Sequence, residues 1–385
     1  MVLELSLRVV YRGVLPVVVA LGVVASLATI WVLAQPGLRK AAANRYFLAL
    51  AAFDLLLFLF YLPILVSACG CTFPNYGSAY YFTHFGWSLA NSFHGMGTYT
   101  LVLLALDRFV GVWFSTAFKR LQRPPFAFTH RMVAVVVLSV GVHVPFMPLG
   151  NVVCAEDKNI KCYSNTTTCE SGAWVSVDGY ECNYDQTLHI AYRYFKTLIV
   201  HWLPYALMFV FNVSLVIAVI LGKVRFPRSA AKGAADHEHQ GAARTGARQT
   251  KKNKEGILVA TVIAMTASYV LFTLPITIFL TGFADTGTDR CKYYNPKEML
   301  RHMGNILLLA EHVLHIIFLL LIYPRFRREM MSLVRRRGAT TEEGDTTSPD
   351  DQRSSSRPLN SALHSAKARD SNAPPSSHFM ESDIS

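Results

Sequence analysis

Charged residues are scarce in this chain of 385 amino acids, because Asp, Glu, Lys and Arg together make up only 16% of it. An ordinary soluble domain has about 25%. The sequence also lacks a P-loop, a dinucleotide-binding glycine motif, a nucleophile elbow and the paired Cys and His spacing of a zinc site. These absences argue against the enzyme and metal-binding classes that the motifs mark. We therefore predict no enzyme activity, no cofactor and no metal.

Long apolar runs take the place of charge, and 52% of the residues are hydrophobic. A helix needs about 20 apolar residues to cross a bilayer, where lipid offers no partner to free backbone groups. Seven runs qualify: 14–34, 46–68, 85–114, 132–150, 198–222, 257–283 and 303–323. The first run is too long for a signal-peptide core, and no small-residue cleavage site follows it. The sequence predicts an all-α membrane protein, a bundle of seven transmembrane helices.

The net charge of +12 comes from short basic clusters between these runs, which is a membrane pattern and excludes a nucleic-acid partner. The clusters lie in residues 39–45, 119–131, 223–254 and 325–337. The segment 150–191 has Lys158 and Lys161 as its basic residues, beside several acids. The positive-inside rule therefore places the basic loops and the C-terminus in the cytoplasm, and residues 1–12 outside.

Cysteine placement gives an independent test of this orientation. All seven cysteines fall in loops predicted to lie outside, where disulfides persist: Cys69, Cys71, Cys154, Cys162, Cys169, Cys182 and Cys291. The odd total leaves at least one thiol unpaired within the chain. The sequon at Asn165 lies in the same outer loop and predicts glycosylation.

The remaining chain predicts three further segments. Residues 229–253 are rich in Ala, Gly and Lys and predict a mobile loop. Residues 323–337 predict a short amphipathic eighth helix, with Phe326 and Met331 facing lipid and its arginines meeting anionic headgroups. The seven-transmembrane domain, with this eighth helix, is thus predicted over 13–337. Residues 338–385 have too few apolar side chains to form a core and predict a disordered cytoplasmic tail.

Polar residues inside spans are costly and mark functional candidates. Asp54 lies within the second span, and Asp107-Arg108-Phe109 closes the third. Together with Pro204 and Pro275 in the fifth and sixth spans, these residues resemble the rhodopsin-like (class A) G-protein-coupled receptors. The resemblance covers about residues 12–335 and implies a cell-surface receptor that activates a heterotrimeric G protein.

Two segments carry a finer resemblance: the fourth span from Ser139 to Pro145, and the fifth span from Pro204 to Asn212. Both are similar to the pattern of invertebrate neuropeptide receptors of the FMRFamide-receptor type, although His143 stands where that group has Asn. We therefore expect an extracellular peptide, and specifically a neuropeptide, as the ligand.

Several positions depart from the rhodopsin-like pattern. They are Ser26 for the Asn of the first span, Thr83 for the Cys above the third, Tyr269 and Thr273 for the Phe and Trp of the sixth, and Leu319 to Tyr323 for the Asn-Pro-x-x-Tyr of the seventh. Tyr323 survives, whereas the Asn-Pro hinge does not. These changes put the usual activation switch in doubt, though not the fold.

For Asp107 and Arg108 the resemblance implies a cytoplasmic latch, in which Asp107 pairs Arg108 at rest and releases it to the G protein. The alternative is an arginine that merely extends to the interface at a helix end. We count Phe109 and Tyr323 with this coupling site.

Asp54 is buried in a span and needs a partner. In the resembling family this Asp helps to bind sodium, but Ser26, Gly97, His315 and Leu319 stand where the other contributors lie, and we expect no complete sodium site. Asp54 then either pairs with His315 or is protonated. His315 and Glu311 are one helical turn apart, so they can also pair with each other.

The ligand pocket is expected to open outward between the third, fifth, sixth and seventh spans. The predicted lining residues are Trp87, Asn91, His94, Tyr99, His201 and Trp202, although aromatic residues in spans also serve as packing or interface anchors. Ala90 stands where amine receptors carry Asp, which argues against a monoamine ligand. The seventh span has no internal Lys that could form a Schiff base with retinal, which excludes a photoreceptor. In the resembling family a disulfide joins the third span to the second outer loop, and Thr83 cannot form it. Cys69 or Cys71 would replace the missing cysteine, with Cys182 as the partner.

Two functions remain open. The first is a neuropeptide receptor of the plasma membrane that activates a heterotrimeric G protein, its tail phosphorylated by a receptor kinase for arrestin. The second is a decoy or scavenger receptor that binds ligand but couples weakly, which the lost motifs favour and the retained Asp107-Arg108 opposes. A transporter or membrane enzyme would need converging intramembrane charges, and Glu311, His312 and His315 are the one such cluster.

Overall fold

The computed structural model describes residues 13–39, 41–67, 73–114, 116, 118, 126–154, 172–178, 186–222, 242–282 and 296–342. The chain divides into two compact units, residues 1–336 and 337–385.

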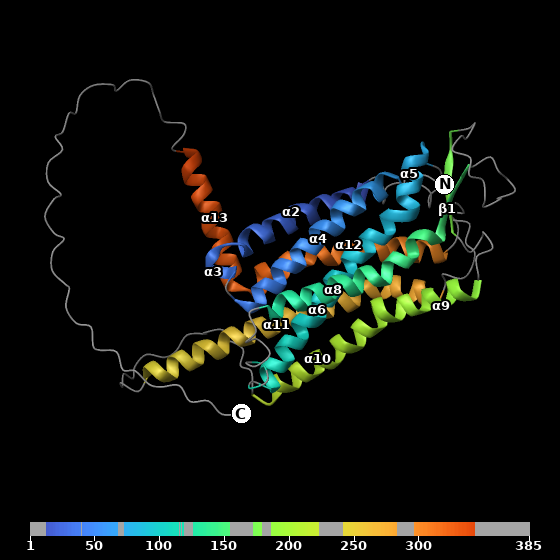
Figure 1. Ribbon diagram of the computed structural model, residues 1–385. Coiled ribbons are helices and arrows are strands. Elements are labelled where there is room, and N and C mark those ends of the chain that lie inside the picture. The colour runs from blue at the N-terminus through green and yellow to red at the C-terminus, as the bar shows by residue number, and fades with distance from the viewer. Residues whose placement is uncertain are drawn as a thin grey trace, which may run out of the picture. The chain divides into compact units, whose positions relative to one another are not determined.

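Seven long helices run side by side in the first unit (Figure 1). They are α2 (Leu15–Leu33), α4 (Ala42–Ser67), α6 (Trp87–Trp113), α8 (Ala127–His143), α10 (Leu203–Ile220), α11 (Ala242–Gly282) and α12 (Pro296–Ile322). Helix α6 is central, because it contacts α4, α8, α10 and α11. Helix α12 closes the bundle by packing on both α11 and α2. The predicted fold class is confirmed.

Six helices within the described part of the chain are long and apolar enough to cross a membrane, and α8 is a shorter apolar helix. A 3-10 segment, η3 (Val144–Leu149), continues α8 toward residue 150. Pro145 and Pro148 lie in this segment, and proline cannot donate the backbone hydrogen bond that an α-helix needs. The fourth span is therefore α-helical for most of its length and 3-10 at its end.

Every span except the first begins earlier than the sequence predicted, and the difference is largest for the third, fifth and sixth. The third starts at α5 (Tyr76–Tyr80) and continues through η2 (Tyr81–Gly86), because the Asn75 side chain accepts a hydrogen bond from the Ser78 amide at 2.7 Å and caps the helix. The fifth starts at α9 (Gln186–Thr197) and η5 (Leu198–Trp202).

Helix α11 starts at Ala242, so the predicted loop over residues 229–253 is wrong for residues 242–253. Ala, Arg, Gln and Lys are frequent there and favour helix, which lets the sixth span extend beyond its apolar part.

Buried hydroxyl groups are satisfied inside the helices that carry them. Thr29, Ser92 and Thr100 each donate to the carbonyl oxygen four residues earlier, at 2.8, 2.7 and 2.7 Å. This bond removes the cost of placing a hydroxyl among apolar side chains. Polar residue types can therefore sit in spans without marking a site.

Helices α11 and α12 approach closely at one glycine. A Cβ atom at Gly304 would lie 2.8 to 2.9 Å from the Cβ, Cα and N atoms of Ile276. Because two of these are backbone atoms, a larger residue would push the helices apart. This close approach therefore sets the spacing between α11 and α12.

A two-stranded hairpin lies near α5 at one end of the bundle (Figure 1). Strand β1 (Gly150–Cys154) pairs antiparallel with β2 (Trp174–Asp178), and Phe73 bridges to Trp174. Trp174 is buried against Phe73, Phe82 and their neighbours. Cys154 is disulfide-bonded, to a cysteine outside the described residues. The hairpin is therefore anchored to the start of the third span.

The predicted eighth helix is present as α13 (Pro324–Glu342). A separate short helix, α3 (Pro36–Arg39), connects the first two spans. Met331 is 50% exposed, as expected for a lipid-facing side chain. The prediction for Phe326 is wrong, because it is 0% exposed and joins the core cluster that contains Leu38 and Phe47. The disordered tail was predicted from residue 338, but α13 continues to Glu342, so the prediction is wrong for residues 338–342. The rest of the predicted tail lies outside the described residues and stays a prediction.

Candidate functional site

Asp107 is at the centre of a charged cluster at the end of α6. Its side chain is buried, and Arg108 Nη2 donates to Asp107 Oδ2 at 2.5 Å. Arg131 Nη1, from α8, lies 3.4 Å from Asp107 Oδ1 and donates to the Tyr46 hydroxyl of α4 at 2.8 Å. The carboxylate of Asp107 thus joins α6 to α8, and Arg131 extends the link to α4.

Arg108 is directed at Asp107 rather than only at the surface. Its side chain is 14% exposed, and its guanidinium lies 5.7 Å from the centre of the Phe118 ring. The Arg108 Nε atom is buried without a hydrogen-bond partner among the described residues. Phe109 stacks on Phe211 of α10, with ring centres 5.5 Å apart. The geometry contains the pairing that a latch requires.

Tyr323 also contacts the second span. Its hydroxyl donates to Asn44 Oδ1 at 3.1 Å, and Asn44 Nδ2 donates to the Leu38 carbonyl at 2.9 Å. The Tyr323 ring lies beside Phe47, with centres 6.4 Å apart. Tyr323 therefore ties the junction of α12 and α13 to the start of α4.

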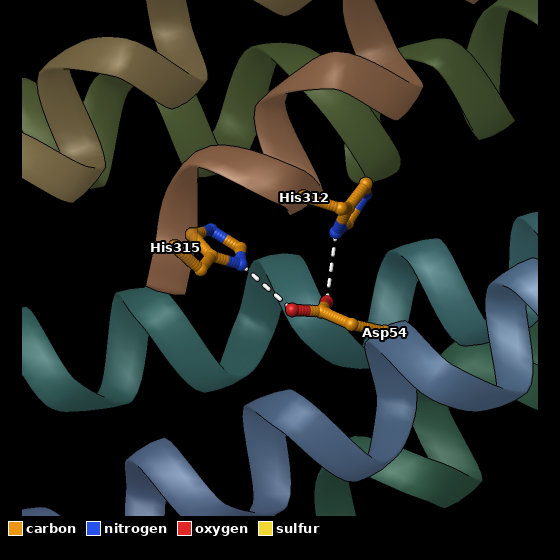
Figure 2. Close-up of side chains that lie close together, drawn as sticks. All are labelled: Asp54, His312 and His315. Carbon is orange, nitrogen blue, oxygen red and sulfur yellow. Dashed lines mark hydrogen bonds and ion pairs between the residues drawn. The ribbon is translucent and has the colours of Figure 1, made fainter. Parts of the chain in front are cut away.

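Asp54 lies in a second, fully buried polar cluster between α4 and α12 (Figure 2). His312 Nδ1 is 2.8 Å from Asp54 Oδ1, and His315 Nδ1 is 2.7 Å from Asp54 Oδ2. The other ring nitrogen of His315 is 2.8 Å from Glu311 Oε1. Both pairings that the sequence left open for His315 are thus present together, and His312 adds a third contact.

The cluster continues toward the third span. His312 Nε2 is 3.1 Å from His94 Nδ1, and the His94 ring stacks on Tyr269 with centres 6.0 Å apart. The second oxygen of Glu311 and His94 Nε2 are buried without hydrogen-bond partners among the described residues. Ser26 lines a cavity of about 10 Å³ beside Asp54, His312 and His315. That volume is room for about one water-sized sphere.

The six predicted pocket residues do not form one group. His94 and His201 lie near each other, with ring centres 6.1 Å apart, and both are buried. The Tyr99 hydroxyl donates instead to the Ile199 carbonyl at 2.6 Å. Trp202 is 42% exposed, and its Nε1 donates to Thr281 Oγ1 at 3.2 Å.

The other two predicted lining residues, Trp87 and Asn91, lie one turn apart at the start of α6. Both are partly buried. Trp87 packs edge-on against Tyr61 and Phe82, with ring centres 5.9 and 6.0 Å away. Trp87 therefore packs between elements in the described structure.

A hydroxyl network that the sequence analysis missed links α10 to α11. The Tyr205 hydroxyl lies 2.7 Å from Thr273 Oγ1 and 2.8 Å from Thr277 Oγ1. Thr98 Oγ1 of α6 donates to the Tyr269 hydroxyl at 3.1 Å. Thr273, which stands where the resembling family has Trp, therefore holds the fifth span to the sixth. The signal was the four-residue spacing of Thr273 and Thr277, which places both on one helix face.

Other contributors were visible in the sequence without an assigned role. In the sequence, Arg131 belongs to a basic cluster, Tyr46 and Asn44 carry no signal, and His312 stands out only as a polar residue in a span. Their partners lie on other helices, and helix pairing is not contained in spacing along the chain. The predicted disulfide partners Cys69, Cys71 and Cys182, and the sequon at Asn165, lie outside the described residues.

Comparison with known proteins agrees with the arrangement of these helices. Residues 14–337 match the family described as serpentine type 7TM GPCR chemoreceptor Srw. The chain is also 31% identical, over 144 residues, to a probable G-protein coupled receptor of Caenorhabditis elegans. That alignment covers 36% of this chain and 33% of the relative, so the chain matches about a third of the relative's length.

Proposed function

This chain belongs to the Srw family of serpentine seven-transmembrane G-protein-coupled chemoreceptors, and on that premise we propose that it detects an extracellular peptide and activates a heterotrimeric G protein. It is a multi-pass membrane protein of a non-enzymatic family. The observation that carries the coupling proposal is the buried Asp107 carboxylate, shared by Arg108 and Arg131 from two different helices.

Asp107, Arg108 and Arg131 act as a latch in this proposal. At rest, Asp107 neutralises Arg108 and holds α6 against α8. Ligand binding at the other end favours a conformation in which these helices separate at the Asp107 end. Arg108 then loses its partner and becomes available to the G protein, which is a shift between two populations of the receptor. Phe109 and Tyr323 support the latch by packing on α10 and by bonding to α4.

A peptide ligand is supported by what the helices present toward the hairpin end. Ala90 is buried where an amine receptor carries Asp, so no carboxylate stands there for a monoamine. The disulfide-bonded hairpin β1–β2 offers backbone and side-chain surface beside the bundle. His94 Nε2 and His201 Nδ1 are buried without hydrogen-bond partners among the described residues, and both can bond to polar groups of a ligand. The similarity to FMRFamide-type receptors favours a neuropeptide.

The proposed setting is the plasma membrane, with residues 1–12 outside and the C-terminus in the cytoplasm. The basic residues of α13 and the loops would then face anionic lipid headgroups. In this orientation Asn165 is glycosylated, Cys69 or Cys71 pairs with Cys182, and the chain beyond Glu342 forms a disordered tail. Ser and Thr residues of that tail would receive phosphate from a receptor kinase and bind arrestin.

A decoy receptor that binds ligand without efficient coupling is the second candidate. Leu319 is buried in the core where the usual receptors carry a polar hinge residue. Thr273 ties the fifth and sixth helices together through Tyr205, which opposes their separation. These two features favour a bundle that opens less readily than that of other rhodopsin-like receptors.

A peptide-library screen in cells that carry a promiscuous G protein separates the two functions. The coupling receptor responds to a subset of peptides, and Arg108→Ala abolishes the response at equal surface expression. The matched control is Arg45→Gln, because exposed Arg45 lies over the Phe128 ring without contacting Asp107. A response that survives Arg108→Ala refutes the latch. Peptide binding without any response supports the decoy.

A further inference from the structure

Asp54, His312 and His315 form a compact group of metal-ligating side chains. Each offers one ligand atom, and these atoms all lie within 4.8 Å of one another. Figure 2 shows both imidazole rings directed at the same carboxylate, each with its Nδ1 atom toward a different oxygen. All three side chains are buried, and they come from two helices, α4 and α12.

We infer that Asp54, His312 and His315 bind a divalent transition-metal ion of the zinc class, and that the ion joins α4 to α12. The sequence predicted no metal because the three ligands follow no zinc-motif spacing. Only the packing of α12 against the second span brings them together.

The distances fit this ion after a small displacement. Zinc holds nitrogen and carboxylate oxygen at about 2.0–2.2 Å in tetrahedral geometry, which separates neighbouring ligand atoms by about 3.4 Å. The present nitrogen–oxygen separations are 2.8 Å and 2.7 Å. The two nitrogens approach different oxygens of Asp54, and the three ligand atoms lie within 4.8 Å of one another. Side-chain rotation therefore has to bring both nitrogens to about 3.4 Å from one oxygen and from each other. The adjoining cavity of about 10 Å³ has room for one atom-sized ligand at the fourth position, beside Ser26.

Partners in a second layer orient both histidines for this role. A histidine that binds metal through one nitrogen usually donates the other N–H to a carboxylate or another acceptor. His315 Nε2 meets Glu311 Oε1 at 2.8 Å, and His312 Nε2 meets His94 Nδ1 at 3.1 Å. Both Nδ1 atoms are thereby left for the metal. Each ligand histidine thus has a hydrogen-bond partner that fixes the orientation of its ring.

Charge balance also favours a dication. Two buried carboxylates, those of Asp54 and Glu311, each lie within hydrogen-bond distance of a His315 nitrogen. A dication offsets their negative charge, which lowers the cost of burying it.

The donor set selects the class of ion. Imidazole nitrogen suits zinc, copper and nickel, whereas sodium, magnesium and calcium prefer oxygen ligands. Two of the three donors here are nitrogen atoms, and Gly97 adds no donor at its position beside Asp54. The site therefore differs in chemistry from the sodium site that the resemblance associates with this Asp.

Metal uptake by the purified full-length receptor tests the inference without any signalling readout, so its failure leaves the proposed function untouched. The receptor is stripped with a chelator in detergent and dialysed against Zn²⁺ alone, Na⁺ alone or Mg²⁺ alone. The variants are Asp54→Asn, His312→Gln, His315→Gln and, in the second layer, Glu311→Gln. The matched control is His143→Asn, because His143 is equally buried but its Nδ1 bonds to the Ser139 carbonyl of its own helix.

We expect one Zn²⁺ per wild-type chain and per His143→Asn chain. Losing a second-layer partner typically lowers metal affinity about 10- to 100-fold, which we expect for Glu311→Gln, and each ligand variant should lose more than about 100-fold. Equal uptake by wild type and the three ligand variants would place the metal elsewhere and overturn the inference. Stabilisation by Na⁺ but not by Zn²⁺ would overturn it as well.

Wild-type protein alone decides the question if a ligand variant does not fold. Co²⁺ bound in place of Zn²⁺ should give the intense visible bands of a four-coordinate site with nitrogen donors. Zn²⁺ should also raise the thermal midpoint in a concentration-dependent way, because an ion that binds only the folded state stabilises it. A weak six-coordinate cobalt spectrum, or a midpoint unmoved by Zn²⁺, refutes the site.

Discussion

Replacing Asp107 with Asn removes the negative charge that holds Arg108 and Arg131 at the end of α6, with almost no change in side-chain volume. If this charge keeps the receptor at rest, the variant should signal without ligand. The lost interaction belongs to the resting state alone, so the equilibrium moves toward the active conformation.

The structure gives the size of this effect. A hydrogen bond to a charged group contributes about 1.5–3 kcal/mol. The Arg108 contact to Asp107 is short at 2.5 Å, whereas Arg131 lies 3.4 Å away, at the limit of a hydrogen bond. The arginine side chains are 14% and 21% exposed, so water weakens both contacts. We therefore expect the lower end of the range, about 1.5 kcal/mol, which is about a tenfold rise in the active population.

Ligand-independent activation of a co-expressed G protein measures this rise, normalised to receptor at the cell surface. Arg131→Gln should raise basal signalling by less, because its contact is longer. Arg45→Gln is the control for removing a positive charge near the same end. The reasoning fails if Asp107→Asn reaches the surface at the wild-type level and its basal signal equals that of wild type.

Three further predictions concern stability and processing. Gly304→Ala should lower the thermal midpoint in detergent, by about 1–3 kcal/mol of overpacking against the Ile276 backbone. Gly141→Ala, with no atom within 4 Å, should leave the midpoint unchanged or raise it; equal effects of the two would contradict the close approach. Tyr205→Phe removes two hydroxyl contacts between α10 and α11 and should cost about 1 kcal/mol, at about 0.6 kcal/mol for each bond in a membrane protein; an unchanged midpoint would argue against the network. Asn165→Gln should abolish the mobility shift that glycosidase produces in receptor from animal cells, and a shift that persists would exclude this sequon.

Much of the fold was predictable from the sequence, because a lipid environment permits few solutions. Run length identified all seven helices of the bundle, and apolar composition alone was sufficient for this. The helix ends were less predictable. Polar residues such as Asn75 extend a helix by capping it, and the start of α11 depends on helix propensity rather than on hydropathy.

Spacing predicted the sites only where the partners are neighbours in the chain, and the pair of Asp54 with His315 followed from the family resemblance instead. Asp107 and Arg108 are adjacent, and Glu311 and His315 are one turn apart, so spacing alone suggested both pairs. Arg131, by contrast, reaches Asp107 from another helix.

His94 and His312 are likewise brought together by packing. The helix contacts that join them, α6 to α11 and α11 to α12, have no signature in one sequence. Phe326 shows the same limit, because its burial depends on which helix α13 packs against.

Nucleotide exchange on a purified heterotrimeric G protein, catalysed by receptor in lipid nanodiscs, tests the central claim most directly and needs no identified ligand. We predict that Asp107→Asn accelerates exchange about tenfold over wild type, and that adding Arg108→Ala to the same chain returns the rate to that of empty nanodiscs. Fast exchange by the double variant would contradict the account, because Arg108 would then not be the group that Asp107 restrains.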